Sequence, residues 1–280
     1  MNNILKTTVI AGFAAMLGSA TLVAQDAAAS KDSSCCPISI EKLSASLSFG
    51  VEGVHAFRGK AVTMDSIQAS FDLGYAVTDA LGIYAGVWNN APLSGANDWN
   101  ETDISFGATY AFQGFVFDAG YTFYWFNNNS TRPANSHEIK AGVSYDTSAL
   151  LGKYLGGATL VPSLYYYYDF DHMANYLEVA ISGSLPVSKW AFDKDFLSVE
   201  ASIFYGFVNS ERNPGVSSRS TNGYNYVGAT ADLVWKINDI FSVRGGVRWV
   251  ANDDQNKYGS NQNGHSDNQV WGGISTVIGF

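Results

Sequence analysis

From residue 43 to the C-terminus, apolar and polar residues alternate within segments of ten to fifteen residues, and turn-rich segments separate them. Alternation at period two predicts β-strands with one apolar face. A membrane-spanning strand needs about 9–11 residues, and every segment reaches that length. The predicted strands cover residues 43–57, 66–77, 81–90, 100–112, 115–126, 137–147, 159–170, 175–185, 196–207, 223–236, 240–250 and 268–280.

The two faces of each predicted strand differ in charge. In the strand 115–126, the apolar face carries Phe117, Tyr121 and Trp125, whereas Asp118 falls on the opposite face. With the registers chosen in this way, no Asp, Glu, Lys or Arg falls on the apolar face of any of the twelve strands. The charges are therefore collected on one side of the predicted sheet.

A soluble β-sandwich also has one apolar face per strand, turned towards a core. Three features favour a membrane barrel instead. The strands are longer than the usual strand length of about five or six residues. Aromatic residues lie near many strand ends. The apolar face runs the full length of every strand, as contact with lipid requires. The predicted fold class is all-β: a transmembrane antiparallel up-and-down β-barrel of about twelve strands in the outer membrane, in contact with outer-membrane lipid.

The connections between predicted strands alternate in length, and outer-membrane barrels have short periplasmic turns and longer external loops. Three connections depart from this pattern, because 171–174 is short for an external loop and 148–158 and 186–195 are long for periplasmic turns. The short connections mostly follow even-numbered strands and the longer ones odd-numbered strands. This alternation predicts that both termini lie in the periplasm. The short turns are 78–80, 113–114 and 237–239, and the longer polar loops are 91–99, 127–136, 208–222 and 251–267.

The last predicted strand ends on an aromatic residue. Alternate positions from Val270 to the end fall on one face, and they include Ile274, Ile278 and Phe280. This pattern resembles the terminal-strand signal that the barrel assembly machinery of Gram-negative bacteria recognises. We therefore predict that Ile274, Ile278 and Phe280 form an assembly signal and that this machinery is a partner.

The N-terminus resembles an export signal, with a positive Lys6 followed by an apolar run over 9–24. A single anchoring helix is the alternative, but the run is short for a membrane span and is interrupted by small and polar residues. Small residues allow cleavage after Ala24 or Ala29. The predicted organisation is a signal peptide over 1–24, a flexible periplasmic segment over 25–41 and an outer-membrane barrel over 42–280.

Composition narrows the function. Charged residues make up 15% of the chain and the net charge is −9, which argues against a nucleic-acid partner because such a partner needs a basic face. Cys35 and Cys36 are adjacent, which suits a flexible segment or a cross-link to a partner better than a bond to each other. The four histidines are scattered without zinc-ligand spacing, and no cofactor motif is present.

The charged residues on the inner face predict the contents of the lumen. They comprise nine carboxylates and five cations. In one interpretation the carboxylates line a wet pore and favour cations or neutral polar solutes; in the other they pair with the cations and brace the barrel. An acidic wall facing a basic wall would place a transverse field across the lumen. The predicted lumen-lining residues are Glu52, Arg58, Asp72, Glu101, Asp103, Asp118, Glu138, Lys140, Glu178, Glu200, Asp232, Lys236, Arg244 and Arg248.

The order of several short segments resembles the TorF-type porin family of Gram-negative outer-membrane proteins over residues 43–280. The resemblance implies a passive pore for small polar solutes or ions, without naming the solute. This chain departs from the family at His55, where an aromatic residue is expected. The matching segments are Ala56-Phe-Arg-Gly59, Gly82-Ile-Tyr-Ala-Gly-Val-Trp88, Glu101-Thr-Asp103, Asp118-Ala-Gly-Tyr121, His137-Glu-Ile-Lys-Ala-Gly142, Pro162-Ser-Leu-Tyr165, Asp169-Phe-Asp171 and Tyr176-Leu-Glu178.

Two other functions remain open. A hydrolase would need a catalytic group at the external mouth; Asp169 and His172 are the nearest candidates, but no nucleophile stands beside a base. A structural or adhesive barrel would act through the polar loops 208–222 and 251–267. Calcium binding by Asp253-Asp254 and Asp267 lacks the ligand spacing of known sites.

Overall fold

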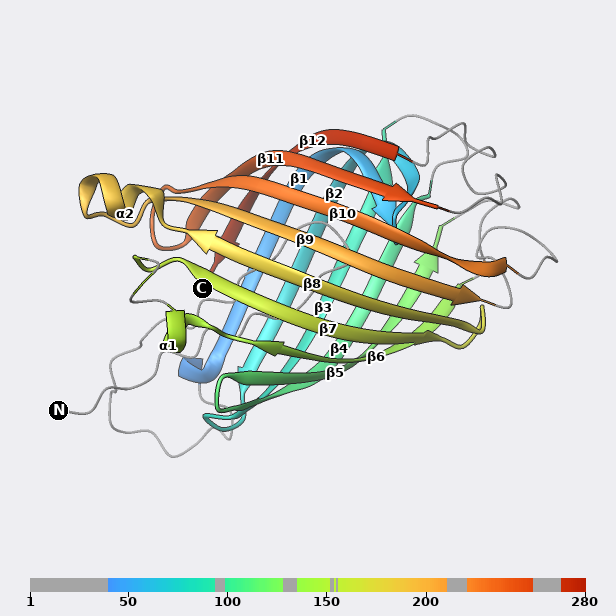
Figure 1. The fold of residues 1–280 in the computed structure, drawn as a ribbon, viewed down its shortest axis with the longest axis horizontal. Helices are drawn as coiled ribbons and strands as arrows, with labels where there is room; N and C mark the ends of the chain where they lie inside the picture. Colours follow the sequence, from blue (N-terminus) through green and yellow to red (C-terminus); the bar gives the residue numbers. More distant parts are fainter. Residues whose placement is uncertain are drawn as a thin grey trace.

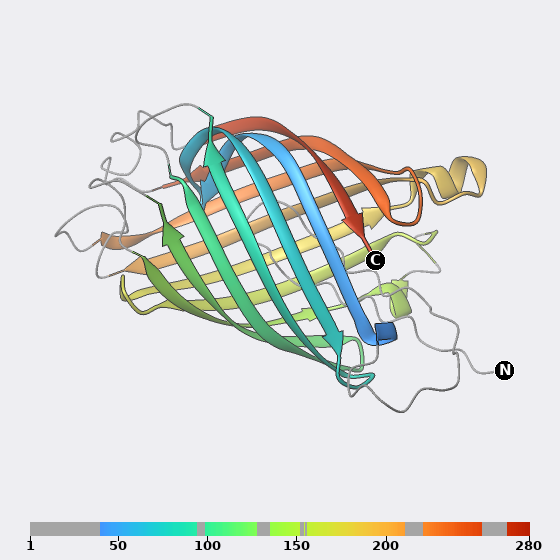
Figure 2. The same ribbon diagram turned by 180° about the vertical axis from the view of Figure 1, so that it is seen from behind.

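A computed structural model describes residues 40–93, 99–127, 135–151, 154, 156–210, 221–253 and 268–280. Twelve antiparallel strands close into one barrel, in which each strand pairs with its neighbours in sequence and β1 pairs with β12 (Figures 1 and 2). The predicted fold class is thereby confirmed. The strands are β1 (Leu43–Phe57), β2 (Lys60–Ala76), β3 (Leu81–Pro92), β4 (Glu101–Phe112), β5 (Phe115–Phe126), β6 (Ser136–Tyr145), β7 (Thr159–Asp169), β8 (Ala174–Leu185), β9 (Leu197–Ser210), β10 (Thr221–Lys236), β11 (Phe241–Asn252) and β12 (Asn268–Gly279).

Among the described residues, three short helical segments accompany the barrel: η1 (Ile40–Lys42), α1 (Ser148–Leu151) and α2 (Val187–Phe192). In the part of the chain that the structure describes, none of the helices has the length and hydrophobicity of a membrane span. Helix α2 lies in the long link between β8 and β9. There the Ser188 hydroxyl accepts hydrogen bonds from the backbone N–H groups of Phe196 and Leu197 and donates one to the carbonyl of Lys194, which folds the link compactly.

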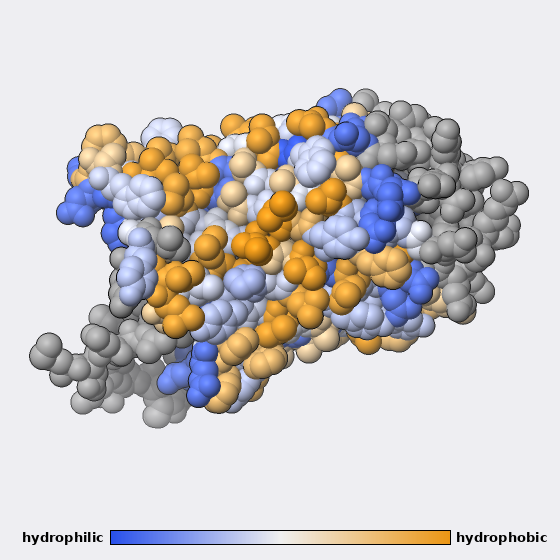
Figure 3. Space-filling view, viewed as in Figure 1, coloured by the Kyte–Doolittle hydropathy of each residue, from blue (hydrophilic) through white to orange (hydrophobic). Residues whose placement is uncertain are grey.

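The outer wall of the barrel carries the predicted apolar face. Exposed and less exposed positions alternate along the strands, as in β5, where Phe117 and Trp125 are exposed and Asp118 is buried. Figure 3 shows apolar residues spread over the middle of the wall and hydrophilic residues gathered towards its two ends. Because no water is present in the bilayer core, only a closed barrel with such a wall can span it with strands.

The C-terminus closes the barrel. Phe280 and Ala45 exchange two backbone hydrogen bonds, of 2.8 and 3.0 Å. They lie at the same end of the barrel as the turns 77–80 and 113–114. The predicted signal peptide, cleavage sites and cysteine pair fall within 1–39, outside the described residues, as do most of the loops 208–222 and 251–267, including Asp254 and Asp267.

One predicted boundary was wrong. The pattern assigned residues 58–65 to a connection, but β2 begins at Lys60, so the link from β1 is the two-residue turn Arg58-Gly59. The segment contains the polar residues Arg58, Lys60 and Asp65. The segment is instead a continuation of both strands, and its course determines the shape of the lumen.

Candidate functional site

The hairpin formed by residues 53–65 leaves the barrel wall, and we call it the inward hairpin. The ladder between β1 and β12 ends at Glu52, and the ladder between β2 and β3 begins at Ser66. Between these points the two halves of the hairpin pair with each other, with a register shift after His55 and a left-handed backbone (φ +47°) at Asp65. Both ribbon views show this end of β1 and β2 curling away from the wall.

The tip of the inward hairpin reaches the opposite side of the lumen. Arg58 is 3% exposed, and its Nη2 donates a 2.6 Å hydrogen bond to Glu138 on β6. The hydroxyl of Tyr224 on β10 donates to the carbonyl of Arg58 (3.2 Å), and the side-chain amide of Asn252 on β11 donates to the carbonyl of Gly59 (2.9 Å). Since β6 lies five strands from β1 in one direction around the barrel and seven in the other, these contacts span the lumen.

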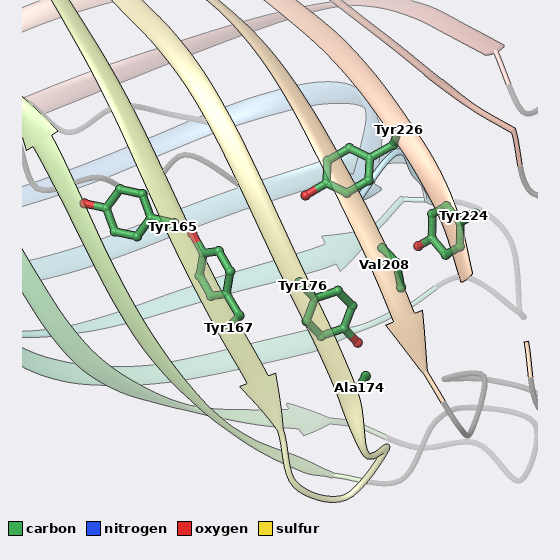
Figure 4. Close-up of a cluster of buried hydrophobic side chains, with 7 residues drawn as sticks. All are labelled: Tyr165, Tyr167, Ala174, Tyr176, Val208, Tyr224 and Tyr226. Atoms are coloured by element: carbon green, nitrogen blue, oxygen red, sulfur yellow. The ribbon is translucent and has the colours of Figure 1, made fainter. Parts of the chain in front are cut away.

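A cluster of inward tyrosines receives this tip. The buried residues Tyr165, Tyr167, Tyr176, Tyr224 and Tyr226 come from β7, β8 and β10, and Figure 4 shows them on one wall, with Val208 of β9 between the tyrosines of β8 and β10. The guanidinium carbon of Arg58 lies 3.2 Å from the ring centroid of Tyr176 and 5.2 Å from that of Tyr167. This cluster was not predicted, although its signal is present in the sequence: on β7, Tyr165 and Tyr167 alternate with the outward Tyr166 and Tyr168.

The stem of the hairpin is held by one apolar and one polar contact region. Val54, Ala56 and Ala61 form a buried cluster with Val250 and Trp271 of the wall. On the other side, the imidazole Nε2 of His55 lies 3.2 Å from a carboxylate oxygen of Glu101, and both side chains are fully buried. His55 also packs against the indole of Trp88, with ring centroids 5.0 Å apart. His55 thus supplies a polar anchor for the hairpin.

The inner wall beside β1 carries a network of ion pairs. Arg248 contacts Asp232 (2.6 Å) and Glu52 (3.3 Å), and Glu52 also accepts a 3.0 Å hydrogen bond from the indole of Trp271. Arg244 contacts Glu200 (2.5 Å) across the intervening β10.

On the opposite wall, Lys140 contacts Asp118 (2.8 Å), and the hydroxyl of Tyr84 donates to the same carboxylate (2.8 Å). The Lys140 ammonium also lies 5.1 Å from the ring centroid of Tyr84. Four of the five predicted cations pair with predicted inward carboxylates, which fits the bracing interpretation, and the fifth, Lys236, pairs with Asp195.

The structure places most predicted lumen residues inside the barrel. Asp72 and Glu200 are half-buried, and Asp72 accepts a 3.0 Å hydrogen bond from Ser70. Two placements differ from the prediction: Arg58 sits at the hairpin tip and not on the wall, and Lys236 lies at the rim, 46% exposed at its side chain and paired with Asp195. The buried members are Glu52, Arg58, Glu101, Asp103, Asp118, Glu138, Lys140, Glu178, Asp232, Arg244 and Arg248.

The candidate hydrolase residues form a turn. Asp169 accepts hydrogen bonds from the backbone N–H groups of Asp171 and His172 and contacts the His172 ring at 2.8 Å. A carboxylate that caps the N–H groups two and three residues ahead is typical of a tight turn. This geometry gives the pair a structural role in the short β7–β8 link. Among the described residues, no group of three or more His, Cys, Asp or Glu side chains is placed to hold a metal ion.

Tyr226 lies directly across Gly206, and this contact can be tested. A Cβ atom at Gly206 would stand 2.0 Å from Cζ of Tyr226. We therefore expect Gly206→Ala to displace Tyr226 and to lower the free energy of unfolding by about 1–3 kcal/mol, the usual range for overpacking. Denaturant titration of the refolded barrel, followed by tryptophan fluorescence, measures it. Gly245→Ala is the matched control because its nearest atom stands at 3.8 Å; equal losses in both variants would refute the contact.

Comparison with known proteins shows a likeness of fold only. No protein-family model and no curated protein matches the chain, so the TorF-type family is not shown. The solved structures similar to it include the NanC porin (8% identity, 84% of this chain and 98% of that chain, TM-score 0.47) and the KdgM porin (10%, 85% and 99%, 0.43). OmpT, an outer membrane protein of Vibrio cholerae, is also similar (11%, 85% and 98%, 0.39). The closed twelve-stranded barrel with an apolar outer wall is the architecture of outer-membrane β-barrel proteins.

Proposed function

We propose that this protein is a porin-like channel of the outer membrane that passes small polar solutes or ions, and that the inward hairpin narrows its external half. The observation that carries the proposal is the excess of acid inside the barrel. Asp72, Asp103 and Glu178 have no ion-pair partner in the described part of the chain. An unpaired carboxyl group inside a bilayer must be hydrated or protonated. Asp103 and Glu178 are buried, whereas Asp72 is half-buried, which favours a water-filled passage beside Asp72.

The orientation is part of the same proposal. The short turns and the closing contact between Phe280 and Ala45 face the periplasm, with both termini, while the inward hairpin stands at the external end. The leader exports the chain, and Ile274, Ile278 and Phe280 are recognised by the barrel assembly machinery. Support comes from the position of Phe280, which is 69% exposed and forms the seam between the first and last strands.

Cation preference follows from the acidic excess. In planar bilayers with a salt gradient, we expect the refolded barrel to give a reversal potential on the cation-selective side. Neutralising the half-buried carboxylate by Asp72→Asn, alone and with Asp103→Asn, should lower the ratio of cation to anion permeability. Asp239→Asn is the control, since Asp239 lies in the exposed turn between β10 and β11. An unselective channel that both lumen substitutions leave unchanged would rule out the acidic filter and the transverse field.

A non-conducting barrel is the second candidate, and the inward hairpin is the observation that favours it. The hairpin residues Val54, His55, Arg58 and Thr63 are each at most 3% exposed, so the hairpin is packed inside the external half of the barrel. Liposome swelling separates the two functions. Solute uptake supports the channel, whereas no uptake by either the wild type or a variant with a displaced hairpin supports a structural or adhesive barrel acting through external loops.

A further inference from the structure

The surroundings of the Arg58 guanidinium have the composition of a site for organic cations. One face of the group lies against the ring of Tyr176, at 3.2 Å from the centroid, and Tyr167 stands at 5.2 Å. Glu138 supplies the negative charge at 2.6 Å. Aromatic faces with a carboxylate are the recurrent means by which proteins bind guanidinium and ammonium groups. We call Glu138, Tyr167, Tyr176, Glu178 and Tyr226 the cation cradle.

The cradle contains polar atoms that do not bind Arg58. The hydroxyl of Tyr226 donates a 2.8 Å hydrogen bond to one oxygen of Glu178, but the other Glu178 oxygen has no hydrogen-bond partner among the described residues. The same holds for the hydroxyl of Tyr176 and for Nε and Nη1 of Arg58. Tyr176 and Glu178 are at most 2% exposed. A guanidinium that approached with a different orientation would therefore find a second carboxylate and a second hydroxyl to bind.

The backbone at the hairpin tip indicates that the arginine side chain is required there. Arg58 has φ +48° and Gly59 has φ +79°, so both residues of the turn are left-handed. Two-residue turns of this kind favour Asn or Asp followed by Gly, because other side chains crowd the backbone when φ is positive. A long cationic residue at the first position gains nothing from the turn itself. What it gains is the contact with Glu138 and Tyr176.

The tip of the inward hairpin is held by fewer contacts than its stem. Beyond Glu52 and Ser66 its halves pair with each other, and its stem keeps backbone hydrogen bonds from Leu93 to the carbonyl of Asp65 and from Trp99 to that of Val62. At the tip, two neutral hydrogen bonds, from Tyr224 and Asn252, accompany the ion pair with Glu138. A free cation that occupies the cradle therefore replaces the strongest contact of the tip.

We propose that the cation cradle is a binding site for solutes that carry a guanidinium or ammonium group, and that Arg58 occupies it as an internal substitute for such a solute. Binding of the solute and seating of the hairpin are then mutually exclusive. The inference names the solute class of the channel and in that respect rests on the proposed function. Occupation of the site by a solute frees the hairpin tip from the opposite wall and widens the external half of the barrel.

The test measures binding directly, without conduction. Arg58→Ala empties the cradle and keeps both carboxylates and the tyrosines. Calorimetric titration of the refolded variant in detergent micelles with methylguanidinium should show saturable binding that is at least about tenfold tighter than that of methylurea, a neutral molecule of the same shape. The wild type should bind methylguanidinium at least about tenfold more weakly than Arg58→Ala, because Arg58 competes for the site.

Two variants locate the site and guard against misfolding. Arg58→Ala combined with Glu138→Gln should lose about tenfold in affinity for methylguanidinium, while Arg58→Ala combined with Asp239→Asn should not. Heat-dependent gel mobility confirms that each barrel is folded. Equal affinity for methylguanidinium and methylurea in folded Arg58→Ala, or binding that Glu138→Gln leaves unchanged, would overturn the proposal.

The same set of measurements separates this proposal from the proposed function. Selective binding in micelles without conductance in bilayers would retain the cation site and reject the channel. Conductance without selective binding would retain the channel and reject the cation site. If both hold, methylguanidinium added to the external side should raise the conductance of the wild type and block that of Arg58→Ala, whereas methylurea should do neither.

Discussion

Reversing the charge at the hairpin tip with Arg58→Glu is expected to expel the inward hairpin and to raise the single-channel conductance several-fold. In the wild type, Arg58 compensates Glu138 inside the lumen, with Glu178 close by in the same cradle. A third carboxylate at this place leaves no cation to compensate the other two. Breaking a buried ion pair costs on the order of 3–5 kcal/mol when the remaining charge stays buried. Moving the hairpin out hydrates all three carboxylates and avoids that cost.

Position and conductance can be measured separately in the same variant. In the wild type the hairpin lies inside the barrel, so trypsin should not cleave after Lys60 in the folded protein; in Arg58→Glu it should, and mass spectrometry of the nicked barrel identifies the site. Arg58→Lys is the conservative control, because it keeps the charge near Glu138 and should leave conductance close to that of the wild type. The exchange Arg58→Glu with Glu138→Arg should restore protection. A protected Lys60 together with unchanged conductance in Arg58→Glu would show that the hairpin is not displaceable.

The strands were predictable because a barrel wall is a local pattern repeated twelve times. In β5 the contrast between Phe117 outside and Asp118 inside is present in the sequence and in the structure alike, since every strand meets the same two environments. Glycines such as Gly206 gave no such signal. Their need for space arises from Tyr226 on the neighbouring strand, and only the register brings the two together.

The inward hairpin was not predictable from local pattern. Its departure from the wall depends on where the ladders with β12 and β3 stop, and those positions are far away in the chain. The ion pairs posed the same difficulty. Arg244 and Glu200 lie on strands separated by β10, so their contact depends on two registers at once. The sequence therefore indicated which charges face inward, but it did not indicate that Arg58 crosses the lumen to Glu138.

A charge placed on the lipid-facing wall is expected to destabilise the barrel strongly. Val247 lies near the middle of β11 on the outer face and is 58% exposed. Val247→Arg would hold a guanidinium at mid-depth in hydrocarbon, where an arginine on a barrel wall costs about 2–4 kcal/mol. We expect the free energy of unfolding in phospholipid vesicles, from guanidinium chloride titration followed by tryptophan fluorescence, to fall by that amount.

Depth is the variable that distinguishes a membrane wall from a merely apolar surface. Ile240 precedes β11 in the turn at its end and is 51% exposed, so Ile240→Arg places the same charge at the water interface, where the expected cost is only about 0–1 kcal/mol. A soluble barrel would tolerate arginine equally at both exposed positions, since water reaches each of them. Equal stability of the two variants in vesicles would therefore argue against a membrane-embedded wall, whereas a loss confined to Val247→Arg fixes the hydrocarbon layer at the middle of β11.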